Sequence, residues 1–358
     1  MLPVTLLTGL DDTFRGAVAG NLLAAAGPTA VLVEYDVSAL SAGSVVRIAR
    51  TATGVIDREV ITMDHPCVSC AMRGSLVQLL ASIAAVERYA VAIVNVPAAG
   101  DTHAIATELD HDPGLDVATI VTTVDTGSVI ADLTGDQLIR ERGIPTAAED
   151  GRAIAEVVVR QLESATAAIL SSDDATVREL VQAIGPQLSV HTTPAGLLGV
   201  RRPRPVVEPG SIAAPADGLT FVWQSGRPFH PERLYDALED LVAGSARGRG
   251  TLWIATQHRT RLSWDSFGTN IAIGALGPWL ADLPADRWPA VGQQHQARSA
   301  LEWHPEYGDR ASYLSLTGPA LDVRELRELL DGCVLRADEA VHPLTDPFAP
   351  YLEGSTAA

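Results

Sequence analysis

Two cysteines are the residues in this chain best suited to hold a metal ion. Cys67 and Cys70 form a C-x-x-C motif within "DHPCVSCAMRGSL". Two thiolates with this spacing can bind one tetrahedral Zn²⁺ from two sides. The motif leads into an expected helix, whose N-terminal N–H groups should lower the pKa of a nearby thiol. Two cysteines do not complete a zinc site, so we name His65, just upstream, and Glu34, at the end of an expected strand, as further candidate ligands.

A lone C-x-x-C motif also has other interpretations. It can be a redox pair, although the surroundings typical of a thioredoxin-like site are missing here. It can also be two buried thiols without a role, although this motif lies in a polar turn bounded by Pro66. His65 taken alone fits a loop residue better than it fits a ligand, and Cys333 is expected to pack in a core.

A second stretch has the outline of a phosphate-binding loop. "PVTLLTG" reads as an apolar strand and runs into "LDDTFRG". A working loop reads G-x-x-x-x-G-K-[ST], in which glycines and a lysine cradle phosphate and a hydroxyl holds Mg²⁺. Counting from Gly9, the chain has Phe14, Arg15 and Gly16 at the last three positions. Phenylalanine disfavours the required backbone, arginine is a longer planar group, and Gly16 has no hydroxyl.

Two aspartates in the same loop also oppose phosphate binding. Asp11 and Asp12 place negative charge where phosphate oxygens would approach. We therefore interpret Gly9, Asp12, Arg15 and Gly16 as a vestigial phosphate loop, with an ordinary strand–turn–helix connection as the simpler interpretation. GTP and Mg²⁺ are expected to bind weakly or not at all.

The other parts of a GTPase site are altered as well. Asn95 stands where a metal-positioning acid is expected after a buried strand, and the nearest acid, Asp101, follows several residues later. A guanine-reading N-K-x-D would follow "ATAAIL", where the chain has Ser-Ser-Asp-Asp at 171–174. All 26 basic residues are arginine, so any mechanism that needs a lysine is excluded. We therefore expect no catalytic residues of a GTPase in this chain.

Apolar strands and amphipathic helices alternate through the first two hundred residues. This order predicts an α/β domain with a parallel sheet covered by helices. A hairpin is expected around Thr53-Gly54 within 45–64. The expected strands are 3–9, 29–35, 89–98, 115–125 and 165–172, and amphipathic stretches lie at 73–86 and 152–164.

A Pro-rich stretch at 201–218 predicts a linker between two domains. After it, a strand at 219–224, a helix from Pro231, short strands within 250–277 and 311–317 and a helix at 322–332 predict a smaller α+β domain. We expect the first domain at 1–200, the second at 219–345 and a tail at 346–358.

Composition limits the partners. The chain has 358 residues and a formal net charge of −18, which argues against direct contact with nucleic acid. We find no secretion signal and no uninterrupted apolar stretch of membrane-spanning length, and three cysteines suit a reducing compartment. A cytoplasmic protein without a membrane partner is expected.

The order of these motifs resembles the CobW-type GTPases. The resemblance rests on the phosphate-loop outline, "VLVEYD", "CVSCAMRGSL" and "AAILSSDD", followed by "RPFHPERLYDALEDL", "RGRGTLWIATQH" and "LRELLDGCVLRADE". It spans about residues 2–340. It implies a P-loop NTPase-like domain at 1–200, here degenerate, and a CobW C-terminal domain at 219–345. It also implies a role in zinc, cobalt or related metal homeostasis.

The family's cysteine motif reads C-x-C-C, and this chain has Cys67, Ser69 and Cys70 at the three positions. The resemblance carries the family's acidic residue onto Glu34. The histidine-rich tract of many members is missing, which argues against metal storage. An actinobacterial branch with C-V-S-C and a degenerate P-loop looks closer still. It is linked to zinc depletion, and one such branch recruits a hibernation factor to ribosomes.

We therefore predict a zinc-binding, non-catalytic adaptor or metallochaperone on a GTPase-derived scaffold. Its expected partners are the metal ion and a protein, either a metalloprotein client or a ribosome-associated factor. Two alternatives remain open at this point: a divergent GTP-binding metallochaperone, and a zinc-responsive factor that acts at the ribosome.

Overall fold

The computed structural model describes residues 1–65, 67–198, 207, 209–211, 218–339 and 343–352. The chain forms two compact units, Met1–Val206 and Val207–Ala358. The boundary between the two units along the chain, after residue 206, falls within the predicted linker at 201–218. Most of that linker, and the last six residues of the predicted tail at 346–358, lie outside the described residues.

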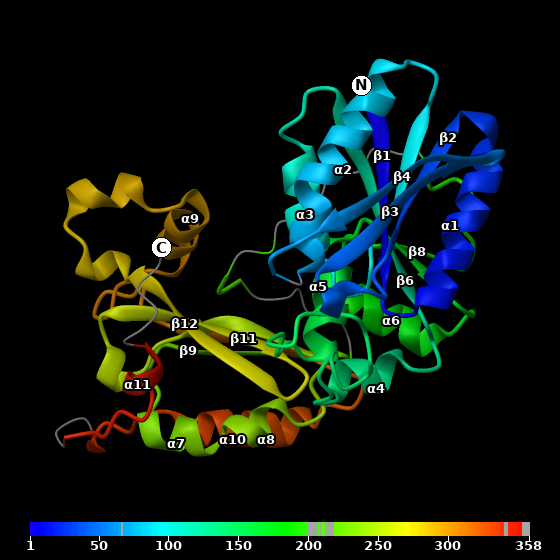
Figure 1. Cartoon of the computed structure of the whole chain (residues 1–358). Coiled ribbons are helices and arrows are strands. Elements are labelled where there is room, and N and C mark those ends of the chain that lie inside the picture. The colour runs from blue at the N-terminus through cyan, green and yellow to red at the C-terminus, as the bar shows by residue number, and fades with distance from the viewer. Residues whose placement is uncertain (66, 199–206, 208, 212–217, 340–342, 353–358) are drawn as a thin grey trace. The chain divides into compact units, whose positions relative to one another are not determined.

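Unit 1 is built on an eight-stranded sheet with the order β4-β3-β2-β5-β1-β6-β7-β8. Neighbouring strands among β2, β5, β1, β6, β7 and β8 pair in parallel. The β3–β4 hairpin pairs with β2 in an antiparallel manner and lies at one edge. This is the expected parallel sheet, and the hairpin makes it mixed (Figure 1). The strands are β1 Leu2–Gly9, β2 Ala30–Asp36, β3 Ser44–Thr51, β4 Gly54–Thr62, β5 Val91–Asn95, β6 Leu115–Val124, β7 Ala167–Leu170 and β8 Ser189–His191.

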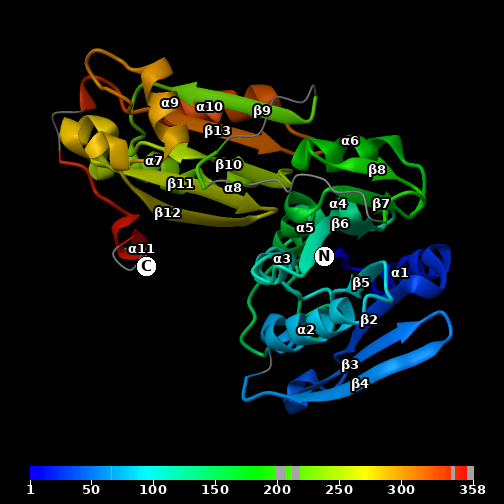
Figure 2. The ribbon, with the colours of Figure 1, turned by 90° about the horizontal axis from the view of Figure 1, so that it is seen from above.

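Helices cover the central strands of this sheet on both faces (Figures 1 and 2). Leu22 and Leu23 of α1 pack with Leu7, Leu32 and Ile93 from the strands beneath them. The central strands are therefore apolar almost throughout, as burial on both faces requires. The helices are α1 Asp12–Ala26, α2 Val68–Ala85, α3 Thr102–Leu109, α4 Val129–Thr134, α5 Ile154–Ser164 and α6 Ala175–Ile184.

Helix α2 is the single helix among the described residues that is long and apolar enough to cross a membrane by length and composition. It includes Arg73 and Gln78, so it is not the uninterrupted apolar stretch whose absence was expected. The measure is weak evidence for a membrane span, because a core helix can satisfy it equally well. Met72, Leu76 and Leu80 lie one turn apart and are buried, and α2 packs against α3 and β6.

Unit 2 is an antiparallel five-stranded sheet with the order β12-β11-β10-β13-β9. Its apolar core includes Trp223, Phe229 and Trp264, with Leu326 and Leu330 from α10. The expected α+β arrangement is observed. The elements are β9 Thr220–Ser225, β10 Arg247–Leu252, β11 Thr260–Phe267, β12 Asn270–Pro278, β13 Ser312–Thr317, α7 Pro231–Asp236, α8 Leu238–Val242, α9 Gln293–Glu302, α10 Val323–Cys333 and α11 Ala349–Leu352.

The segment between β12 and β13 was not predicted and is organised around one carboxylate. Asp309 accepts hydrogen bonds from the backbone N–H groups of Leu280 and Ala281 at 3.0 Å. It also bonds His295 at 2.9 Å and accepts from Ser299 at 3.2 Å, both on α9. Burial acts to raise the pKa of Asp309, but these hydrogen bonds outweigh burial and hold the pKa at about 2. Asp309 thus fastens a polar helix that lacks an apolar stripe.

The low pKa of Asp309 makes the stability of unit 2 depend on pH. Because the folded pKa lies below the ordinary value of 3.8, the stabilisation is complete above about pH 4 and is lost as the pH falls towards 2. We expect Asp309→Asn to lower the free energy of unfolding at pH 7 by about 2 kcal/mol. Urea unfolding at pH 7 and pH 3 measures this difference, which should shrink at the lower pH. Asp286→Asn, at an exposed position of the same segment, should change neither value.

Candidate functional site

The cysteine pair lies at the start of α2. Cys67 is the N-cap residue, and its sulfur accepts a hydrogen bond from the backbone N–H of Cys70 at 3.4 Å. Cys67 is half-buried and Cys70 is exposed. Both thiols therefore belong to one accessible helical turn, as the spacing predicts.

The expectation that the helix N-terminus lowers the thiol pKa does not hold for Cys70. The hydrogen bond with Cys67 and, after it, burial raise the pKa of the Cys70 thiol above its ordinary value. Arg73 opposes this effect only in part. The physical reason is that a hydrogen bond between the two side chains favours the protonated form of the Cys70 thiol.

The structure does not gather the other candidate ligands around the cysteine pair. Glu34 accepts a hydrogen bond from Arg50 Nε at 2.6 Å across the β2–β3 pair, so its carboxylate is engaged in an ion pair. His65 is exposed in the turn before the motif. In the described part of the chain, no three His, Cys, Asp or Glu side chains stand close enough to hold a metal ion together. Glu34 and His65 as ligands stay predictions.

Ser69, between the two cysteines, connects the motif to the neighbouring loop. Its hydroxyl accepts a hydrogen bond from the backbone N–H of Asp101 at 2.9 Å. Asp101 is the N-cap of α3 and accepts from Ala104 N–H at 3.0 Å. The position that carries a middle cysteine in the C-x-C-C pattern therefore has a structural role here.

The former phosphate loop is closed by its own arginine. Arg15 is only 4% exposed, and its guanidinium folds back over the loop. Its Nε donates to Asn95 Oδ1 at 2.7 Å, and its two other nitrogens bond the Gly9 carbonyl oxygen and the Asp12 carboxylate. Burial lowers the pKa of Arg15, and Asp12 and then Asp11 partly offset this effect. The cation is therefore neutralised within the chain.

The helix N-terminus beside this arginine is also occupied. Asp11 caps α1 by accepting the backbone N–H of Phe14 at 2.9 Å. This N–H is one of the groups that a phosphate loop turns towards its ligand. Gly9 is needed for a different reason: its φ is +147°, and a Cβ there would lie 2.0 Å from Thr123 Oγ1. The retained glycine thus serves strand packing.

The cavity next to the loop has the wrong charge for a nucleotide. It measures about 280 Å³ and opens at the carboxyl ends of β1 and β6. One arginine, Arg142, lines it and is ion-paired with Asp132 at 2.5 Å. Negative charge therefore predominates, and it would repel phosphate. The lining carboxylates are Asp11, Asp12, Asp125 and Asp132.

The side chains at the position of the guanine-reading motif are engaged within unit 1. Asp174 caps α6 by accepting Val177 N–H at 3.0 Å, and Asp173 pairs with Arg178 at 2.6 Å. Ser171 donates to Asp125 at 3.0 Å. These side chains hold the ends of β6 and β7 together.

Sequence reasoning noted Arg15 and Asn95 as separate departures and missed that they pair. The parallel pairing of β1 and β5 places Asn95 beside Leu7 near the end of β1, and the hydrogen bond from Arg15 in the first turn of α1 joins the two positions. The sequence did contain a signal for this pair: Arg15 replaces a lysine and Asn95 replaces an acid, and both changes were noted. Their side chains are complementary as donor and acceptor.

Comparisons with known proteins agree with the predicted resemblance. Residues 219–334 match the family model of the cobalamin synthesis protein cobW C-terminal domain, which places this domain in unit 2. The zinc chaperone Rv0106 of Mycobacterium tuberculosis is 26% identical over 390 residues, covering 98% of this chain and 93% of the relative. Zinc-regulated GTPase metalloprotein activator 1 of Dictyostelium discoideum is 22% identical and covers 93% and 80%.

Two solved structures are also similar to the chain. One is the crystal structure of a Zn(II)-bound YjiA GTPase from E. coli, 15% identical with a TM-score of 0.33, covering 93% of this chain and 99% of that one. The other is a Zn(II)-bound triple mutant of YjiA GTPase, 16% identical with a TM-score of 0.35, covering 94% and 100%. With the family model and the two curated relatives, the predicted resemblance to the CobW-type family is confirmed.

The closed loop predicts that Arg15 stabilises unit 1. Arg15→Ala leaves Asn95 Oδ1 and the Gly9 carbonyl oxygen without their donor, which should lower the free energy of unfolding by about 2 kcal/mol or more. Urea unfolding at neutral pH measures this loss. Arg140→Ala, at an exposed position in the same unit, should change stability by less than about 0.5 kcal/mol. Equal effects of the two substitutions would contradict a structural role of Arg15.

Proposed function

We propose that this chain is a zinc-binding metal-homeostasis protein that has lost GTPase activity. The observation that carries the proposal is the contrast between two sites in unit 1. The phosphate loop is closed by Arg15, whose donors are engaged by Asn95, Gly9 and Asp12. The cysteine pair, on the other hand, stays accessible at the start of α2. The names of the curated relatives, a zinc chaperone and a zinc-regulated metalloprotein activator, support the same role.

The cysteine pair fits the transfer of zinc better than permanent storage. Cys67 and Cys70 supply two of the four donors that zinc prefers. The described residues add no third donor near them, so water or another protein would complete the tetrahedron. An ion held by two ligands can pass to a client that offers more of them. We therefore propose a protein client as the partner, a metallochaperone or adaptor role for this chain and a cytoplasmic location.

Three observations support the loss of nucleotide binding. Asp11 caps the helix N-terminus, acidic side chains line the adjacent cavity, and the chain has no lysine. Each of these removes a group that phosphoryl transfer needs: free N–H donors, positive potential or a phosphate-binding ammonium. The scaffold then positions the cysteine turn through Ser69 and the loop at Asp101.

Zinc binding is the direct test of the proposal. After loading with Zn²⁺ and desalting, wild type should retain about one zinc per chain, and the Cys67→Ser/Cys70→Ser variant close to none. Elemental analysis gives both values. Cys333→Ala is the matched control, because Cys333 is 3% exposed and burial raises the pKa of its thiol to about 11. Equal zinc contents in wild type and the double variant would refute the site.

Nucleotide binding separates this proposal from a divergent GTPase. Calorimetric titration of wild type with GTP, GDP and ATP in the presence of Mg²⁺ should give no binding heat. The same result is expected for Arg15→Ala, since the aspartate cap and the acidic cavity remain. Mg²⁺-dependent GTP binding that Arg15→Ala abolishes would support the GTPase instead.

A further inference from the structure

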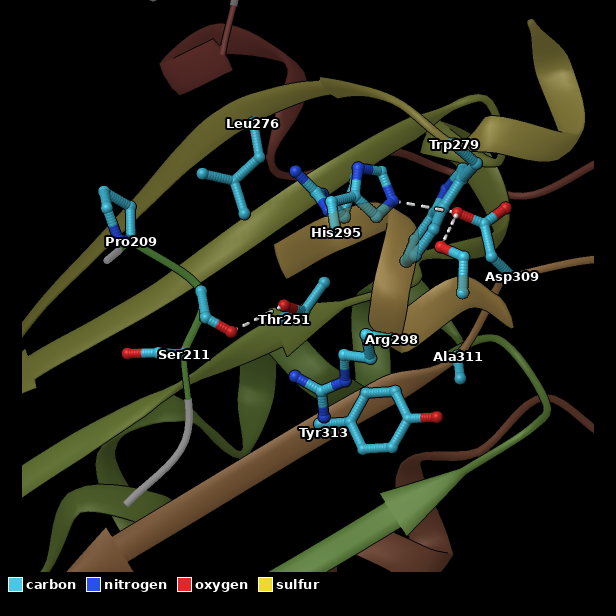
Figure 3. A pocket seen from close by; sticks show the side chains of 13 residues that line it. Pro209, Ser211, Thr251, Leu276, Trp279, His295, Arg298, Asp309, Ala311 and Tyr313 are labelled. Carbon is cyan, nitrogen blue, oxygen red and sulfur yellow. Dashed lines mark hydrogen bonds and ion pairs between the residues drawn. The ribbon is translucent and has the colours of Figure 1, made fainter. Parts of the chain in front are cut away.

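A second cavity lies wholly within unit 2 and takes no part in the proposed zinc site. It measures about 300 Å³, which is room for about ten water molecules. The sheet forms one wall through Thr251 and Tyr313, and α9 forms another through His295 and Arg298 (Figure 3). Arg261, on β11, also lines the cavity.

The linker end closes the third side of this pocket. Ser211 lines it, and the Gly210 carbonyl oxygen accepts a hydrogen bond from Thr251 Oγ1 at 2.9 Å. Gly210 has a φ of +76°, and a Cβ there would lie 2.6 Å from Leu276 Cδ1. A glycine is therefore required for the chain to pass this close to the sheet.

The pocket has buried donors without acceptors. Trp279 is 2% exposed, and its indole N–H has no hydrogen-bond partner. The buried Nε of Arg261 also lacks a partner in the structure. Leaving such groups unpaired costs about 1–3 kcal/mol each, so two in one cavity call for an explanation.

The nearby carboxylate does not accept from either of these donors. The hydrogen bonds of Asp309 come from Leu280, Ala281, His295 and Ser299 instead. Figure 3 shows Asp309 directed towards His295.

Two like charges meet in this cavity. The Arg298 guanidinium lies 3.9 Å above the centre of the Tyr313 ring. Burial lowers the pKa of Arg261, and the charge of Arg298 lowers it further, whereas Asp309 acts in the opposite direction. The buried Arg261 guanidinium, whose Nε has no acceptor, would be stabilised by an anion in the pocket. Such a pocket is notable in a chain with a net charge of −18.

We propose that this pocket binds a small organic anion, with Arg261 and Arg298 holding its phosphate or carboxylate group. Trp279 supplies an additional N–H donor, and Leu276 and Tyr313 provide apolar surface for the body of the ligand. The volume exceeds what a bare ion needs and lies at the lower end of the range for small-molecule sites.

Calorimetry on the zinc-free full-length chain at constant ionic strength tests this proposal. The probes are phenyl phosphate, benzoate, inorganic phosphate and phenol. We expect phenyl phosphate or benzoate to bind one to one, and the tighter of the two identifies the anionic group. Inorganic phosphate should bind more weakly because it lacks an apolar part, and phenol should not bind because it lacks the charge. Binding of phenol as tight as that of both anions would overturn the proposal.

Variants locate the binding. Arg261→Gln and Arg298→Gln should each weaken the better anion at least about tenfold, since each removes a charge-assisted contact. Arg324→Gln is the matched control, because the Arg324 side chain is 80% exposed on α10. It should bind like wild type, as should Cys67→Ser/Cys70→Ser, which separates this site from the zinc site. A loss as large in Arg324→Gln as in Arg261→Gln would refute a specific pocket.

A measurement on wild type decides the matter even if a pocket variant fails to fold. The indole N–H signal of Trp279, identified by its absence from the NMR spectrum of Trp279→Phe, should shift when the better anion is added. It should stay in place when phenol is added. If none of the indole N–H signals moves at saturating phenyl phosphate or benzoate, the pocket does not bind this class of ligand.

Discussion

A buried guanidinium must be surrounded by acceptors, and in unit 1 this requirement governs the loop between β1 and α1. Arg15 meets it with Asn95 at the end of β5, the carbonyl oxygen of Gly9 at the end of β1 and Asp12 in the first turn of α1. One side chain thus links two strands and a helix where a P-loop protein would hold phosphate. Because each of the three guanidinium nitrogens makes a hydrogen bond inside the chain, the turn can stabilise the fold without a ligand.

Polar groups elsewhere in the molecule also differ in whether their hydrogen-bond or ligand positions are filled. Asp11, Asp173 and Asp174 are all engaged at helix ends or in ion pairs, and the former nucleotide cleft is negatively charged. The accessible cysteine pair lacks further ligands among the described residues, and the pocket of unit 2 has two buried donors without acceptors. A ligand that completes an unfilled coordination shell or pairs with an unsatisfied donor binds with a favourable free energy. The proposed zinc site and anion pocket therefore lie at these two positions, whereas the groups of the loop between β1 and α1 are engaged within the chain.

Local patterns predicted most of the elements. Continuous apolar runs indicated β1, β2, β5, β6 and β7, and the helix from Pro231 begins at that residue. Two elements gave no such pattern. Strand β8 has only three half-buried residues, and α9 is polar, so neither shows an apolar periodicity. Helix α9 depends on contacts with Asp309, which follows it in the sequence, and such contacts are invisible to local reasoning.

By itself, the sequence determined what chemistry is excluded and which groups are available. Without any lysine, a conventional phosphate loop cannot form, and the C-x-x-C spacing places two thiols on one helical turn. Only the tertiary structure decided what those groups meet. It paired Arg15 with Asn95, 80 positions away, engaged Glu34 with Arg50, and brought Arg261, Trp279 and Arg298 to one cavity. The physical reason is that side-chain type sets bonding capacity, whereas sheet order and chain crossing set which partners come within reach.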